Sequence, residues 1–253
     1  VETINLTNAG TQVIDATNIT GATSINTLTN TTQTTITGLA AGVAIGLGHD
    51  NVDGDVDGIM SITLADSTGA ADSLTVNLND TTTGNDTTVD LRITAGVETV
   101  TLEVEDSTDT SNADSTLDVD AINADTLLIT GSEGDVGNTM GLGTLDTDTT
   151  TLDATGYSGI VTATAGTGTA VAFSVDGDAA HSLTGSTGSD TFANTGASAN
   201  ADLTINGVSG TDVYNVTLAA GTADFDSVSN IDTMNITMSG SAAVTMDADG
   251  DVL

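Results

Sequence analysis

Apolar and polar residues alternate over short stretches along the whole chain. Runs of four to six residues with a period of two occur at 61–64, 74–78, 127–130, 161–164 and 213–218. Gly, Asn and Asp, which favour turns, separate these runs. A period of two is typical of a strand with one buried face, and helical apolar spacing nowhere extends beyond about two turns. The pattern predicts an all-β chain.

The size of the apolar side chains indicates how these strands pack. Thr makes up about a fifth of the chain, and aromatic residues account for only 2%. Stacked coils bury small residues in ladders about 4.8 Å apart, whereas sandwiched sheets about 10 Å apart need bulkier side chains. We therefore expect parallel β-helix or β-roll-like solenoid modules, with tandem β-sandwich modules as the alternative.

One segment recurs along the chain. Val-Glu-Thr-Ile-Asn-Leu at 1–6 returns as Val-Glu-Thr-Val-Thr-Leu at 97–102 and, more loosely, as Ile-Asp-Thr-Met-Asn-Ile at 231–236. Such self-similarity is the signature of repeat architectures. We expect the following division of a piece of a longer chain: a first β module at 1–90, a second with Gly-rich turns at 91–223, and the start of a third at 224–253.

The charge of the chain is strongly one-sided. The 36 Asp and Glu face a single basic residue, Arg92, and the formal net charge is −35. Folding brings these like charges together, so they need solvation or bound cations. Most are Asp next to Gly or Asn in turns, where short carboxylates suit the oxygen coordination of calcium. A purely solvated acidic surface is the alternative.

The same charge restricts the partners of the chain. A negative surface excludes nucleic acid and anionic membranes as direct partners. No apolar run approaches the roughly 18 residues that a membrane-spanning helix needs, so we expect no membrane insertion. Calcium sites built in turns fill at extracellular concentrations, which predicts an extracellular location.

Several acidic turns are candidate calcium sites. The densest is 49–58, where repulsion among four carboxylates favours a bound cation over a flexible, solvated loop. Two weaker candidates lie at 176–178 and 247–251. The expected ligands in these three segments are Asp50, Asp53, Asp55, Asp57, Asp176, Asp178, Asp247 and Asp249.

Two further segments resemble a known repeat. Gly-Ser-Thr-Gly-Ser-Asp-Thr-Phe-Ala at 185–193 resembles the RTX nonapeptide Gly-Gly-x-Gly-x-Asp-x-apolar-x, and 207–215 is a looser copy. Both depart from it at the second Gly, and they lie 22 residues apart instead of in tandem. The resemblance implies calcium ligation by Gly188, Asp190, Gly210 and Asp212, and core positions for Phe192 and Tyr214.

The wider pattern resembles the lattice-forming region of RTX-type surface-layer proteins of Gram-negative bacteria, for example at 61–76, 96–102 and 152–159. This resemblance implies a secreted structural protein at the cell surface that self-assembles with identical copies into a calcium-dependent coat. Cell-surface polysaccharide is a further expected partner. A calcium-dependent adhesin or biofilm-matrix module is the alternative, and an ice-binding solenoid, suggested by Thr-x-Thr pairs such as Thr162 and Thr164, is a minor one.

Little in the chain indicates catalysis. His49 and His181 are the only imidazoles, and neither adjoins a nucleophile motif. Enzymes acting on polysaccharides usually need basic residues and aromatic platforms, and this chain has one Arg and no Trp. We expect no enzymatic activity and no catalytic residue, with both histidines at the surface or in turns.

Overall fold

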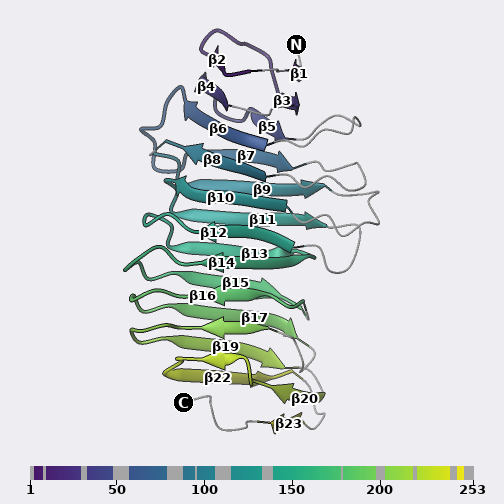
Figure 1. The fold of residues 1–253 in the computed structure, drawn as a ribbon, viewed down its shortest axis with the longest axis vertical. Helices are drawn as coiled ribbons and strands as arrows, with labels where there is room; N and C mark the ends of the chain where they lie inside the picture. The colour runs from purple at the N-terminus through teal and green to yellow at the C-terminus, as the bar shows by residue number, and fades with distance from the viewer. Residues whose placement is uncertain are drawn as a thin grey trace.

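The chain winds into a parallel β-solenoid, as the alternating pattern predicted (Figure 1). The computed structural model describes residues 3–7, 10–29, 33–47, 57–78, 88–94, 96–105, 115–132, 139–177, 179–197, 203–218, 221–239 and 244–247. Strands alternate between two sheets, so each coil contributes one strand to each sheet. Every strand pair within them is parallel.

Among the described residues, the first sheet has 11 strands, and each is hydrogen-bonded to the strands that precede and follow it in this sheet along the chain. They are β1 (Thr3–Thr7), β3 (Ser24–Thr29), β5 (Ala44–Leu47), β7 (Ser73–Leu78), β9 (Thr99–Glu105), β11 (Thr126–Ser132), β13 (Thr151–Tyr157), β15 (Ala172–Asp176), β17 (Thr191–Ala197), β19 (Val213–Leu218) and β22 (Thr233–Met238).

The second sheet, in the part of the chain that the structure describes, has 10 strands that lie between those of the first in sequence. They are β2 (Gln12–Asp15), β4 (Gln33–Leu39), β6 (Asp57–Leu64), β8 (Thr88–Ile93), β10 (Ser115–Ile122), β12 (Thr139–Thr144), β14 (Ile160–Thr164), β16 (Ser182–Thr184), β18 (Thr204–Asn206) and β21 (Val228–Ser229). A separate pair joins β20 (Gly221–Asp224) to β23 (Val244–Asp247).

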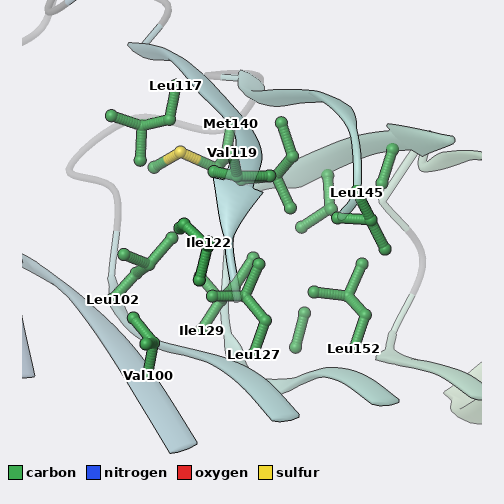
Figure 2. Close-up of a cluster of buried hydrophobic side chains, with 14 of the residues drawn as sticks. Val100, Leu102, Leu117, Val119, Ile122, Leu127, Ile129, Met140, Leu145 and Leu152 are labelled. Carbon is green, nitrogen blue, oxygen red and sulfur yellow. The ribbon is translucent and has the colours of Figure 1, made fainter. Parts of the chain in front are cut away.

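The core lies between the two sheets and consists of the inward residues of both. In the coils around β10, Val100, Leu102 and Leu127 come from the first sheet, and Leu117 and Val119 come from the second (Figure 2). All five are at most 1% exposed. Full burial of each such side chain stabilises the fold by about 1.5 to 3 kcal/mol. Aliphatic side chains of medium size fill this core.

Aromatic residues stack where they do occur. Phe173 and Phe192 occupy paired positions on β15 and β17, with ring centroids 5.1 Å apart and planes 1° apart. Tyr214 pairs with Phe192 on the next strand and meets Phe225 edge to face at 6.4 Å. Phe192 is 0% and Tyr214 2% exposed, which confirms the core positions expected for both.

The recurring sequence segments lie in equivalent structural positions. The copies at 1–6, 97–102 and 231–236 overlap β1, β9 and β22, all in the 11-stranded sheet. Strand pairing continues across the expected module boundaries, since β8 pairs with both β6 and β10, and β19 pairs with β22. The repeat therefore marks equivalent strands of one continuous ladder.

Candidate metal centre

Acidic side chains line one edge of the solenoid. The turns that lead from each strand of the second sheet to the following strand of the first sheet lie at this edge, at the left in Figure 1. Arg92, the only Lys or Arg of the chain, lies in β8 and pairs with Asp90, Nε to Oδ1 at 2.9 Å. We call the following carboxylates the acidic edge: Asp66, Asp72, Glu98, Asp125, Asp146, Asp148, Asp190, Asp212 and Asp232.

Some of these carboxylates shape their own turns. Asp66 Oδ1 accepts hydrogen bonds from the Thr68 hydroxyl at 2.7 Å and from its main-chain N–H at 3.1 Å. These bonds, the hydroxyl first, hold the pKa of Asp66 below its usual value. Asp146 Oδ1 likewise accepts the N–H of Asp148 at 2.9 Å. Such Asx turns explain why the turns are rich in Asp instead of Glu.

Other carboxylates connect successive coils. Asp212 Oδ1 accepts the main-chain N–H of Asp190 at 2.7 Å, and Asp232 Oδ2 accepts that of Asp212 at 2.8 Å. Glu98 Oε2 accepts the N–H of Asp72 in the same way at 2.6 Å. The three accepting residues, Glu98, Asp212 and Asp232, each directly precede a strand of the first sheet. Each caps the equivalent position of the preceding coil. Asp190, Asp212 and Asp232 therefore stack at the coil rise of about 4.8 Å.

The two RTX-like segments are stacked directly on each other. Thr191 pairs with Val213, so the 22 residues that separate Asp190 from Asp212 make one complete coil. A Cβ on Gly210, whose φ is +131°, would overlap the carbonyl oxygen of Gly188. Glycine at 210 thus allows a close approach of the two turns that no other residue permits.

Asp190 is fully committed to main-chain contacts. Its side chain is 0% exposed, and its two oxygens accept the N–H groups of Val171 and Ser186, each at 2.7 Å. A buried carboxylate is stable when charge-assisted hydrogen bonds replace its water. The structure therefore gives Asp190 a role in joining the turns, and its part in calcium ligation stays a prediction.

Asp212 occupies the equivalent position but lacks one of these contacts. Its side chain is also 0% exposed, yet Oδ2 has no hydrogen-bond partner among the described residues. Val208, which corresponds to Ser186, has φ +72°, and its N–H donates instead to Asn206 Oδ1 at 3.0 Å. Burial raises the pKa of Asp212; the N–H of Asp190 lowers it, and repulsion from Asp190 and Asp232 raises it again.

A pocket of about 440 Å³ opens beside Asp212. Asp232 and Asn230 of the next coil lie in its wall, and neither was expected to be a site residue from the sequence. A signal for Asp232 was present, because the second residue of the repeat is acidic at Glu2, Glu98 and Asp232 alike. The lining residues are Val208, Ser209, Gly210, Asp212, Ser229, Asn230, Ile231 and Asp232.

The other expected ligands lie apart from this pocket or outside the described residues. Asp176 ends β15 and is exposed. Asp57 begins β6 and Asp247 ends β23, but their side chains are not described. In the described part of the chain, no three His, Asp or Glu side chains converge on one point. Asp50, Asp53, Asp55, Asp178 and Asp249 lie outside the described residues.

His181 lies in the connection directly before β16 with its side chain buried, so of the two expected positions, surface or turn, it does not occupy the surface; His49 lies outside the described residues. His181 is 0% exposed, Nδ1 accepts the N–H of Val161 at 3.1 Å, and Nε2 has no described partner. Burial lowers its pKa, while the carbonyl and the charge of Asp176 act in the opposite direction. The sequence allowed a surface or a turn position, and burial excludes only the surface, because a residue in the connection between two strands can still point inward.

The fold and this edge define the protein as a parallel β-solenoid with carboxylates stacked along its turns. No protein-family model matches the chain, and no curated protein or solved structure does so either. Across the described ranges, no helix is long and apolar enough to cross a membrane.

Proposed function

We propose that this chain is a non-enzymatic structural segment of an extracellular coat that assembles with copies of itself when calcium binds its acidic turns. RTX-type surface-layer proteins of Gram-negative bacteria are the proteins that its segments resemble. The proposal includes secretion to the cell surface, where cell-surface polysaccharide is a further partner.

The acidic edge is the observation that carries this proposal. Its carboxylates recur in most turns from β6 onward, with the turn at 165–171 as an exception, while the single basic residue, Arg92, already pairs with Asp90 in β8. At a separation of about 5 Å, unit charges interact by several kcal/mol when the effective dielectric constant is near 20. A solenoid with such an edge needs counter-ions to stay compact. Calcium, a divalent ion that takes oxygen ligands, is present outside cells at about millimolar concentration and can meet that need.

The sheet faces support contacts between copies. From β12 to β18, the outward residues of the second sheet are uncharged and mostly hydroxyl-bearing, including Thr162, Thr164, Ser182 and Thr184. Their hydroxyls both donate and accept hydrogen bonds, so two identical faces are mutually compatible. Negative charge along the acidic edge resists association, and calcium relieves that resistance.

Calcium-dependent melting and assembly test the proposal together. The chain is measured in calcium, in magnesium and in chelator, with melting followed by circular dichroism and assembly by light scattering and electron microscopy. We expect calcium alone to raise the melting temperature by several degrees and to produce ordered assemblies. Equal melting temperatures in calcium and chelator would leave the metal assignment without support.

The densest acidic segment has its own variant. The double substitution Asp53→Asn with Asp55→Asn is expected to lower the number of bound calcium ions, as measured by equilibrium dialysis. An unchanged number would make 49–58 a solvated loop. Calcium-dependent adhesion to polysaccharide-coated surfaces by a chain that stays monomeric would favour the adhesin alternative over the coat.

A further inference from the structure

Asp190 and Asp212 form a matched pair within one molecule. The Oδ2 atom of each lies beside a glycine, 2.5 Å from the place that a Cβ on Gly185 or Gly207 would occupy. Ser186 supplies an N–H to Asp190 Oδ2 at 2.7 Å. The corresponding N–H at Asp212 is that of Val208, which donates to Asn206 Oδ1 instead. The buried Oδ2 of Asp212 is therefore left without a hydrogen-bond donor among the described residues.

A second acceptor lies next to that oxygen. The same hypothetical Cβ on Gly207 would overlap the carbonyl oxygen of Asn230 as well as Asp212 Oδ2. The N–H of Gly207 is not available to either, because it donates to the Ser229 carbonyl at 3.1 Å. Two oxygens thus converge on one point, and the contacts of the described residues place no donor between them.

Asp232, in the same coil as Asn230, supplies a third oxygen ligand. Asp232 caps the N–H of Asp212 with Oδ2 at 2.8 Å, and its exposed carboxylate lines the same pocket. Asp232 therefore adds a second negative charge near Asp212. Carboxylate and carbonyl oxygens at one open pocket are the ligand types that calcium takes, with water filling its remaining positions.

We propose that a calcium ion binds between the coils of Asp212 and Asp232, held by Asp212 Oδ2, the Asn230 carbonyl oxygen and the Asp232 carboxylate. The site joins the second of the stacked glycine turns to the next coil and uses two residues, Asn230 and Asp232, that neither Gly-rich segment contains. It rests on the proposed function only in taking calcium as the ion. The ion takes the place of the Val208 N–H as the partner of Asp212 Oδ2, and it links two coils.

The kinds and arrangement of the oxygen ligands at this site favour calcium over magnesium. Its oxygens come from two coils and include a main-chain carbonyl, and calcium accepts such irregular sets of six to eight ligands. Magnesium requires near-octahedral geometry and gives up its water reluctantly. We expect magnesium at equal concentration to leave the site largely unfilled.

The test counts calcium ions on the whole chain by isothermal titration, at protein concentrations where it stays monomeric. Asp232→Asn and Asp212→Asn should each bind one ion fewer than the unsubstituted chain. Glu103→Gln removes the same charge from an exposed residue of β9, outside the acidic edge and the candidate calcium segments, and is the control. It should keep the full number, and circular dichroism establishes that all three variants are folded.

Asp212→Asn has a second readout that does not depend on counting. Its amide can donate a hydrogen bond to the Asn230 carbonyl, so it should melt higher than the unsubstituted chain in chelator but gain less from calcium. Full calcium stoichiometry in both pocket variants would overturn the site. The site would also be overturned if the melting temperature did not depend on calcium but rose on mild acidification, and did so only in chains that keep Asp212. A proton on Asp212 Oδ2 would then take the place of the ion. Failure of the unsubstituted chain to assemble is a separate result and counts against the coat alone.

Discussion

The main-chain N–H of Asp72 donates a hydrogen bond to Oε2 of Glu98, 2.6 Å away on the next coil. The same contact joins Asp190 to Asp212 and Asp212 to Asp232, more than 90 residues further along the chain. A carboxylate before a strand of the first sheet thus stabilises the coil before it. These acids have a mechanical role in the fold whether or not a metal ion is bound.

Asp190→Asn tests this role most directly. The amide keeps one acceptor but sets an N–H₂ group against a main-chain N–H, which leaves buried donors unpaired. We expect the free energy of unfolding in urea to fall by about 1 to 3 kcal/mol. The loss should appear in chelator as well as in calcium. A loss seen only with calcium present would make Asp190 mainly a metal ligand. Glu103→Gln, at an exposed position of β9, is the control and should change little.

The stacked rings of Phe173 and Phe192 predict a large effect of truncation. Both side chains are 0% exposed, so Phe192→Ala leaves a cavity between two coils. We expect a loss of about 3 to 5 kcal/mol in urea unfolding. Phe192→Leu refills part of the space and should cost clearly less. Equal losses for both variants would mean that ring stacking, not volume, dominates at this position.

Two glycines separate backbone strain from steric overlap. Gly42 has φ +78°, and a Cβ added there would meet no atom within 4 Å. Gly42→Ala should therefore cost only the left-handed backbone penalty of about 1 to 2 kcal/mol. Gly210→Ala adds overlap with the Gly188 carbonyl and should cost more. Thermal melting of the two variants, measured side by side, checks the order. If Gly42→Ala were the more damaging, the close approach of the glycine turns would be wrong.

His181 predicts a specific pH dependence of stability. Its pKa is lowered in the fold, so the unfolded chain takes up a proton first as pH falls below about 6.5. The contribution of His181 is therefore complete above that pH and is lost as pH falls through the lowered value. The slope from one proton cannot exceed about 1.4 kcal/mol per pH unit.

The measurement compares urea unfolding of the unsubstituted chain with that of His181→Gln between pH 7.5 and about 5. Protonation of the many carboxylates changes both chains alike, so their difference isolates His181. That difference should shift in favour of the Gln variant as pH falls. A constant difference would show that His181 does not titrate between the folded and unfolded states in this range.

The alternating pattern was sufficient for the strands but not for the turns. The runs at 74–78 and 213–218 coincide with β7 and β19 because burial of every second residue is a local property. The 22-residue spacing of the Gly-rich segments had no evident meaning in the sequence, and the structure shows that it equals one coil. Asp232 was missed as a site residue because its contact with Asp212 spans 20 positions along the chain.

The order of residues along the chain was enough to establish an all-β protein, its inward residues such as Phe192 and Tyr214, and a net charge that one Arg cannot balance. It did not reveal that both oxygens of Asp190 accept hydrogen bonds from main-chain N–H groups. Nor did it reveal that Asp212 has an oxygen with no described partner, or that Asp232 lines the pocket beside Asp212. Those facts required the folded molecule. Strand identity follows from neighbours along the chain, whereas the surroundings of a turn carboxylate depend on the register between coils.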